Sequence, residues 1–171
     1  MRWWLQLVTL VTSCYNVGTI WMAHLGWRLF AAVGRAEFPA YHRAWWYGWR
    51  GIQPVVFPCG ILTTLGALAQ LSARGRAPRA PAWAAWLGVA LQAVTWGATA
   101  AWWGPGQAQL EQVRLDDNTL NPLYRRLLAT HWLRVALITA FAAVQLGMTS
   151  AGLRIAMTDR QPASDAAAGA R

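Results

Sequence analysis

The chain's three histidines are the residues best suited to proton chemistry, because imidazole exchanges protons near neutral pH. They are His24, His42 and His131. Glu37 precedes His42 by five residues, and Arg134 follows His131 by about one helical turn. A carboxylate or guanidinium beside an imidazole changes its proton affinity. These residues are therefore candidates for general acid–base catalysis, in which His42 or His131 removes a proton and Arg134 stabilises the resulting anion.

Sequence motifs for other chemistries are missing. The spacing of Glu37 and His42 does not put both on one helical face, and no HxxxH, ExxH or HExxH pattern occurs. No metal site is predicted, although three histidines and a glutamate could converge through the fold, and a haem held by His24 and His131 stays an alternative. Without GxSxG, P-loop or GxGxxG patterns, nucleophile hydrolases, ATPases and nucleotide-dependent oxidoreductases gain no support. The cofactor is left unknown.

Four long apolar segments have to position these side chains. They cover residues 3–33, 52–71, 83–103 and 127–157. A helix of about 20 residues crosses a hydrocarbon core of about 30 Å, and each segment is long enough. The sequence therefore predicts an all-α fold, a transmembrane four-helix bundle with both termini on the same side. We expect one domain over residues 1–158, with its first segment retained rather than cleaved as a signal peptide, and a disordered polar tail over residues 159–171.

Polar side chains recur with helical spacing along three of these segments. The stripes consist of Gln6, Thr9, Ser13, Asn16, His24 and Arg28 in the first segment, Gln92, Thr95 and Thr99 in the third, and His131, Arg134, Gln145 and Thr149 in the fourth. Polar groups that face lipid are costly, so the stripes should face neighbouring helices. They either form interhelical hydrogen bonds or line a polar cavity that opens at one membrane face.

The predicted topology gathers all three histidines, with several polar and charged residues, at one membrane face. The expected set is His24, Arg28, Glu37, His42, Asn118, Asn121, Arg125, Arg126, His131 and Arg134. A short surface helix is expected over residues 107–115. The aromatic residues of segment 37–51 are typical of an anchor at headgroup depth, which is the simpler interpretation of that segment.

Composition favours a membrane protein. The chain is 56% hydrophobic and 12% charged, whereas soluble domains contain about 25% charged residues. The formal charge of +9 is spread between the apolar segments, where it meets anionic headgroups, so nucleic-acid binding is not expected. All the basic residues are arginine, which is typical of a GC-rich bacterial genome. Together with the four apolar segments, this origin predicts a multi-pass protein of the bacterial inner membrane. Basic residues are almost balanced between the two sides, and only the short turn at residues 73–82 favours cytoplasmic termini.

Two stretches, "WWGPGQAQL" at residues 102–110 and "NPLYRRLLATHWLRVAL" at residues 121–137, resemble small four-helix bacterial membrane proteins distantly related to the anthrone-oxygenase-like family. The matching residues are Pro105, Gln107 and Leu110 after the third helix, and Thr130, His131, Trp132 and Arg134 at the start of the fourth. "FPAYHRAWW" is similar to a Phe-x-x-Tyr-His segment of such proteins. His131 stands where Asn is common, and Gln107 where His occurs. The resemblance implies a four-helix fold and oxidation of aromatic polyketides without a defined cofactor.

Two functions stay open. In the first, a polar, Trp-lined pocket at one membrane face binds or oxidises a hydrophobic aromatic or quinone-like molecule. Its candidate substrate-binding residues are His24, Asn16, Asn121, Trp132 and Gln107. In the second, the chain is a non-catalytic accessory or assembly subunit of a larger membrane complex, or a homo-oligomer, that docks through its tryptophans and arginines. Convergence of His42, His131 and Arg134 in one concave pocket would favour the first function.

Overall fold

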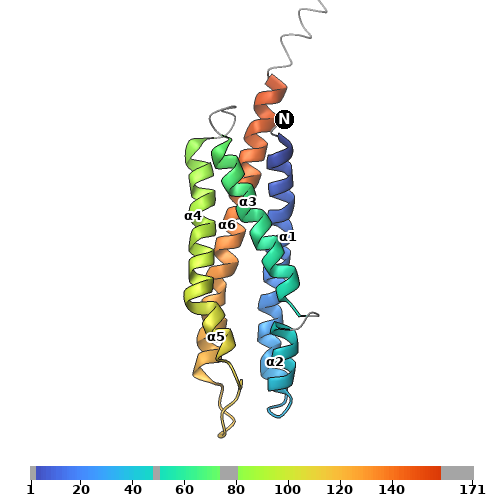
Figure 1. The fold of residues 1–171 in the computed structure, drawn as a ribbon, viewed down its shortest axis with the longest axis vertical. Helices are drawn as coiled ribbons and strands as arrows, with labels where there is room; N and C mark the ends of the chain where they lie inside the picture. Colours follow the sequence, from blue (N-terminus) through green and yellow to red (C-terminus); the bar gives the residue numbers. More distant parts are fainter. Residues whose placement is uncertain (1–2, 48–50, 74–80, 159–171) are drawn as a thin grey trace, which may run out of the picture.

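Four long helices dominate the chain. The computed structural model describes residues 3–47, 51–73 and 81–158, which are helical apart from turns, loops and one isolated β-bridge. The long helices are α1 (Trp3–Leu29), α3 (Gln53–Ser72), α4 (Ala82–Ala98) and α6 (Pro122–Thr158). They run along the long axis of the molecule, and the start of α1 and the end of α6 lie at the same end (Figure 1).

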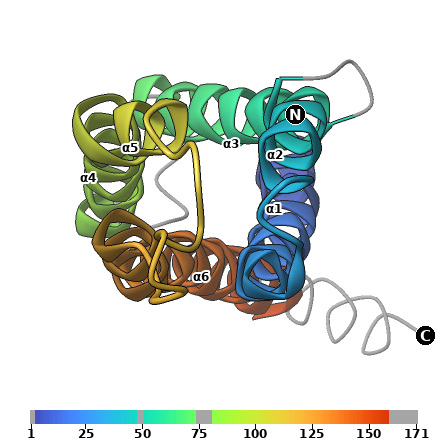
Figure 2. The same cartoon turned by 90° about the horizontal axis from the view of Figure 1, so that it is seen from below.

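The long helices form the four sides of a square when the molecule is seen along its axis (Figure 2). Helices α1 and α4 each pack against both α3 and α6. Shorter elements lie at the end opposite the start of α1: η1 (Phe30–Ala32), α2 (Phe38–Trp46), the π-helix η3 (Thr99–Trp103) and α5 (Gly104–Ala108). By length and composition, α3 and α6 are the two helices in the described residues that are able to cross a membrane.

The predicted segments agree with the long helices, with two corrections. Helix α6 begins at Pro122, five residues before the predicted fourth segment, so Arg125 and Arg126 lie in its first turns. The Asn121 side chain accepts a 2.9 Å hydrogen bond from the Leu123 amide and caps this start. The surface helix predicted over residues 107–115 is wrong. Pro105 starts α5 earlier, and the amide of Asn121 then bonds the Val113 carbonyl, so this backbone pairs with the segment before α6.

Helix α2 was not predicted as a helix. Pro39 occupies its first turn, where a missing amide is tolerated, and Phe38, His42 and Trp46 are spaced by four residues on one buried face. The predicted polar tail at residues 159–171 and the arginines at positions 74, 76 and 79 lie outside the described residues.

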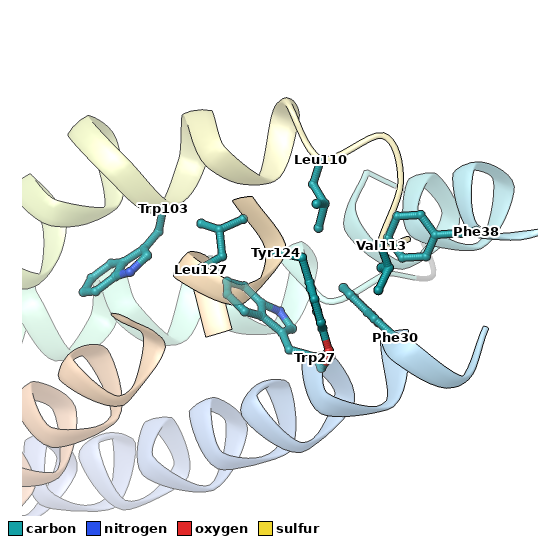
Figure 3. Packing of buried hydrophobic residues seen from close by; sticks show 8 residues of the cluster. All are labelled: Trp27, Phe30, Phe38, Trp103, Leu110, Val113, Tyr124 and Leu127. Atoms are coloured by element: carbon teal, nitrogen blue, oxygen red, sulfur yellow. The ribbon is translucent and has the colours of Figure 1, made fainter. Parts of the chain in front are cut away.

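A buried aromatic cluster joins the elements at this end (Figure 3). Its members are Trp27, Phe30, Phe38, Trp103, Leu110, Val113, Tyr124 and Leu127. The Tyr124 hydroxyl donates a 2.8 Å hydrogen bond to the carbonyl oxygen of Trp27, which ties the start of α6 to the end of α1. The cluster thus fixes the positions of the residues described next.

Polarity is partly inverted between the interior and the surface. Polar residues of the predicted stripes are buried, namely Thr9, Ser13, Asn16, His24, Gln92, His131, Arg134, Gln145 and Thr149. This confirms that the stripes face neighbouring helices. Gln6, Thr95 and Thr99 are half-buried, and Arg28 is exposed at the end of α1. Large apolar side chains on the same helices are exposed, including Val8, Val11, Met22, Leu25, Leu133 and Leu146.

Candidate functional site

His24 of α1 and His131 of α6 meet inside the molecule. Their Nδ1 atoms are 3.2 Å apart, and the two side chains are 1% and 0% exposed. They are separated by 107 positions in the sequence, so only the packing of α1 against α6 brings them together. Each Nε2 atom is buried without a hydrogen-bond partner in the described residues.

Two tryptophans enclose this histidine pair. The ring centre of Trp27 lies 4.2 Å from that of His131, and the ring centre of Trp132 lies 4.2 Å from that of His24. Trp132 is 49% exposed and packs edge-on against Trp21, so it covers His24 from the outside. The predicted substrate-binding residue Trp132 therefore lies on the outer side of the pair. Trp27 was not predicted, although its position one turn after His24 was a usable signal.

Arg134 is a buried cation held by the π-helix η3. Its Nη2 donates a 2.8 Å hydrogen bond to Thr99 Oγ1, and its guanidinium carbon lies 4.4 Å from the ring centre of Trp103. Trp103 is itself fixed by a 3.2 Å hydrogen bond from its Nε1 to Thr130 Oγ1. Within residues 3–47, 51–73 and 81–158, the one ion pair joins Arg35 to Asp116 on the surface. A cation–π contact and one hydroxyl therefore replace a carboxylate as the partners of Arg134.

A narrow, partly open cavity lies beside Arg134 and His131. The space inside it that is open to a water-sized sphere is about 50 Å³. Its polar lining consists of Asn16, Gln92, Thr95, Thr99, His131 and Arg134. Indole rings complete the wall, from Trp27, Trp45, Trp46 and Trp96. This volume holds a few water molecules or a small polar substituent, but a complete aromatic ring requires the tryptophans to shift.

The cavity wall is braced by a short hydrogen-bond chain between α3 and α4. Trp96 Nε1 donates to Thr64 Oγ1 at 2.8 Å, and Thr64 Oγ1 donates to Gln92 Oε1 at 3.0 Å. The buried polar stripe of α4 is therefore both a helix contact and a cavity wall. Gln92 thus both forms an interhelical hydrogen bond and lines the cavity, so both interpretations of the polar stripes apply to it.

His42 lies at a different place. Its Nε2 is 2.9 Å from Gln107 Oε1, which joins α2 to α5, and its ring stacks on Phe38. Because an amide oxygen only accepts, His42 is the donor of this bond. Burial lowers the pKa of His42, and the hydrogen bond to Gln107 raises it in part. Neither residue lines the cavity.

The remaining predicted site residues are also apart from the cavity. Glu37 precedes α2 and is exposed, and the causes of the lowered His42 pKa do not include it. Asn121 caps α6, with its Nδ2 donating 2.8 Å to the carbonyl oxygen of Gln112. The structure thus brings together His24, Asn16, His131 and Arg134, and leaves Glu37, His42, Gln107 and Asn121 outside. No group of three or more His, Cys, Asp or Glu side chains able to hold a metal occurs in the described part of the chain.

No protein-family model matches the chain, and it matches no curated protein and no solved structure. The chemistry of the site therefore has to be inferred from its own residues.

Proposed function

We propose that the chain is a multi-pass integral membrane protein whose helices α1, α3, α4 and α6 all cross the bilayer. Helix α3 has 20 residues and a length of about 30 Å, the thickness of a hydrocarbon core. Helix α4 is shorter but continues directly into η3. The exposed face of α1 is apolar up to Arg28 in its last turn, and its exposed side chains include Trp4, Val8, Val11, Tyr15, Met22 and Leu25.

The inverted polarity supports this proposal more strongly than helix length does. In water, exposing leucine and valine while burying glutamine, histidine and arginine would be unfavourable on both counts. In lipid, the same arrangement is favourable, because polar groups then find partners only between helices. We place the protein in the inner membrane of a bacterium, with both ends of the helix set on one side. Reporter domains fused to each terminus should give the same side, and opposite sides would contradict four crossings.

We further propose that the cavity binds a hydrophobic aromatic or quinone-like molecule through a carbonyl or ionised oxygen. One observation carries this proposal: the buried guanidinium of Arg134 lines the cavity without a carboxylate partner in the described residues. A desolvated cation gains most from an anionic or strongly dipolar oxygen. The surrounding indoles suit a flat apolar ring, once they move to admit one. His131 is the expected proton acceptor, and reaction of the resulting anion with oxygen is the step that the anthrone-oxygenase resemblance implies.

Binding of 1,4-naphthoquinone to the full-length protein in lipid nanodiscs tests this proposal. Arg134→Leu should weaken binding at least about tenfold, which corresponds to about 1.4 kcal/mol. Arg126→Leu is the matched control, because Arg126 also lies on a tryptophan of η3, 4.2 Å from the ring centre of Trp102, but outside the cavity. Arg134→Lys keeps the charge and should retain more affinity than Arg134→Leu.

Each variant has to keep the helicity and thermal unfolding of the parent protein for the comparison to count. A folded protein that binds no naphthoquinone, or binds it equally well after Arg134→Leu, contradicts the binding function. The accessory or assembly subunit is then the better interpretation, and co-purification of a defined membrane partner would test it.

A further inference from the structure

The two rings of the His24–His131 pair meet edge to edge. They are almost parallel, with 12° between their planes, and their centres are 5.4 Å apart. The Nδ1 atoms are much closer, at 3.2 Å, so the contact runs through these two nitrogen atoms and not through the ring faces. This is the geometry of an N–H···N hydrogen bond.

Such a bond fixes the protonation of both rings. A neutral imidazole carries one N–H and one bare nitrogen, so one Nδ1 must donate and the other must accept. The ring that donates has a bare Nε2, and the ring that accepts carries its proton on Nε2. The neutral pair therefore always presents one bare Nε2 that is able to take a proton.

The two histidines differ in their surroundings. His131 lines the cavity, whereas His24 lies behind it, beneath Trp132. Arg134 is on the same helix as His131 and opposes positive charge there, while the nearest arginine along α1 from His24, Arg28, is exposed. The one ion pair among the described residues joins Arg35 to Asp116, so no carboxylate of those residues neutralises Arg134 or Arg28 through an ion pair. Positive charge is therefore better tolerated on His24 than on His131.

We propose that His24 and His131 act as one proton-accepting pair, in which His24 is a positioning residue that keeps the Nε2 of the cavity-lining His131 bare. This inference rests on the proposed binding function. A hydroxyl ligand gives its proton to His131 Nε2, so the ligand O–H bond breaks and an N–H bond forms. The Nδ1 proton of His131 passes along the 3.2 Å hydrogen bond to His24 Nδ1. The products are a ligand oxyanion beside Arg134 and a shared positive charge on the pair, with no change of oxidation state.

The aromatic surroundings suit this charge. The indole rings of Trp27 and Trp132 lie against the two imidazoles, each with 4.2 Å between ring centres. Indole attracts a cation in a desolvated place. The pair also leaves one buried Nε2–H on His24, which has no partner in the described residues while the pair is neutral.

Nitrogen NMR of the ligand-free, full-length protein with ¹⁵N-labelled histidine tests the shared proton directly. We expect a through-hydrogen-bond ¹⁵N–¹⁵N coupling between the Nδ1 atoms of His24 and His131. His42 is the internal control, because its partner is an oxygen atom and it should show no such coupling. Two unprotonated Nδ1 atoms with no coupling would overturn the inference and leave the binding function untouched.

The acceptor role is tested with 4-nitrophenol, whose anion absorbs visible light, and with 4-nitroanisole, which lacks the proton. At a pH where free 4-nitrophenol is mostly protonated, the parent protein should bind it as the anion. His24→Phe keeps a flat ring, and it should reduce the anionic fraction at least about threefold while 4-nitroanisole binding changes less than twofold, since only the proton path is lost.

The possible failures are distinguishable. If His24→Phe binds the anion as fully as the parent, Arg134 alone ionises the probe and the inference is overturned. If the parent binds neither probe, the binding function fails, and the acceptor role fails with it. Wild-type coupling is read without any substitution, so an unfolded His24→Phe variant does not remove the test.

Discussion

The two halves of the helical interior handle their polar groups differently. Toward the start of α1, neutral side chains dominate: Gln70 Nε2 donates 2.8 Å to Gln145 Oε1, and the Thr9 hydroxyl returns to the Leu5 carbonyl of its own helix. Toward α2 and α5, the interior holds three histidines, an arginine and a cavity. Both halves contain buried polar atoms without partners, but among the described residues the second half alone combines them with buried histidines, an arginine and a cavity.

Close contacts at two glycines are a feature of the first half, called the closely packed half below. In the first half, a Cβ atom added at Gly66 would lie 2.5 Å from Thr9 Oγ1, and one added at Gly88 would lie 3.3 Å from the Phe141 ring. Small residues let helices approach closely in lipid, where burial of apolar surface no longer drives them together. The second half contains the cavity beside Arg134 and His131, and it is called the open half below. We expect the close contacts of the first half to stabilise the fold, and we place the proposed binding function in the open half.

The largest expected effect is on the closely packed half. Gly66→Ala should destabilise the fold by about 1–3 kcal/mol, because the new methyl group overlaps Thr9 and the helices must separate. Thermal unfolding in detergent measures this. Gly97→Ala is the matched control, since nothing lies within 4 Å of a Cβ atom there and Gly97 is exposed. Equal stability of the two variants would show that α1 and α3 do not cross closely at Gly66.

The next effect is on the open half. Thr99→Val removes the hydroxyl that accepts the hydrogen bond of Arg134. Such a bond contributes about 1 kcal/mol to the free energy of unfolding. We expect naphthoquinone affinity to fall severalfold, while the unfolding temperature falls by only about 2–4 °C. Thr139→Val on the exposed face of α6 serves as the control. A large loss of stability with unchanged affinity would mean that Thr99 supports the fold and not the cavity.

Helical periodicity was enough to predict the long helices and which faces they bury. The stripe containing Asn16 and His24 was predicted correctly, because a polar residue every three to four positions has only one favourable orientation in an apolar helix. The pairing of His24 with His131 was not predicted. Periodicity shows which face of a helix is buried, but it does not give the axial register of two neighbouring helices. The oxygenase-like activity and the related-family resemblance stay predictions.

The prediction that residues at one membrane face share a site was the least accurate. His42 shares a membrane face with His131 in the predicted layout, yet it bonds Gln107 and lies outside the cavity. Topology assigns residues to an end of the molecule, whereas contact depends on the path of short segments such as α2. Glu37 illustrates this, because the turn before α2 leaves its side chain exposed.

A smaller change in stability is expected from the hydrogen bond between Gln70 and Gln145 in the first half, and a double variant distinguishes this bond from side-chain packing. Gln145→Leu leaves the Gln70 amide without its partner and should cost about 0.6 kcal/mol, the average for such bonds in membranes. Replacing both glutamines with leucine should recover most of this loss, because no buried amide is then unpaired. A double variant less stable than either single variant would mean that the two glutamine side chains stabilise the fold through packing and not through their hydrogen bond.

The smallest effect concerns His42, the histidine outside the cavity. Burial lowers its pKa from the ordinary value of 6.5, so the unfolded chain binds more protons below that value and acidification should reduce stability. Gln107→Leu removes the hydrogen bond that raises this pKa, so the His42 pKa should fall further and the loss of stability between about pH 7 and pH 5 should become steeper. Proton NMR of the His42 ring measures the pKa, and Gln109→Leu, on the exposed neighbour, is the control. A rise of the His42 pKa after Gln107→Leu would show that desolvation does not control this histidine, and α2 would then be less buried than its contacts with Phe30 and Phe38 require.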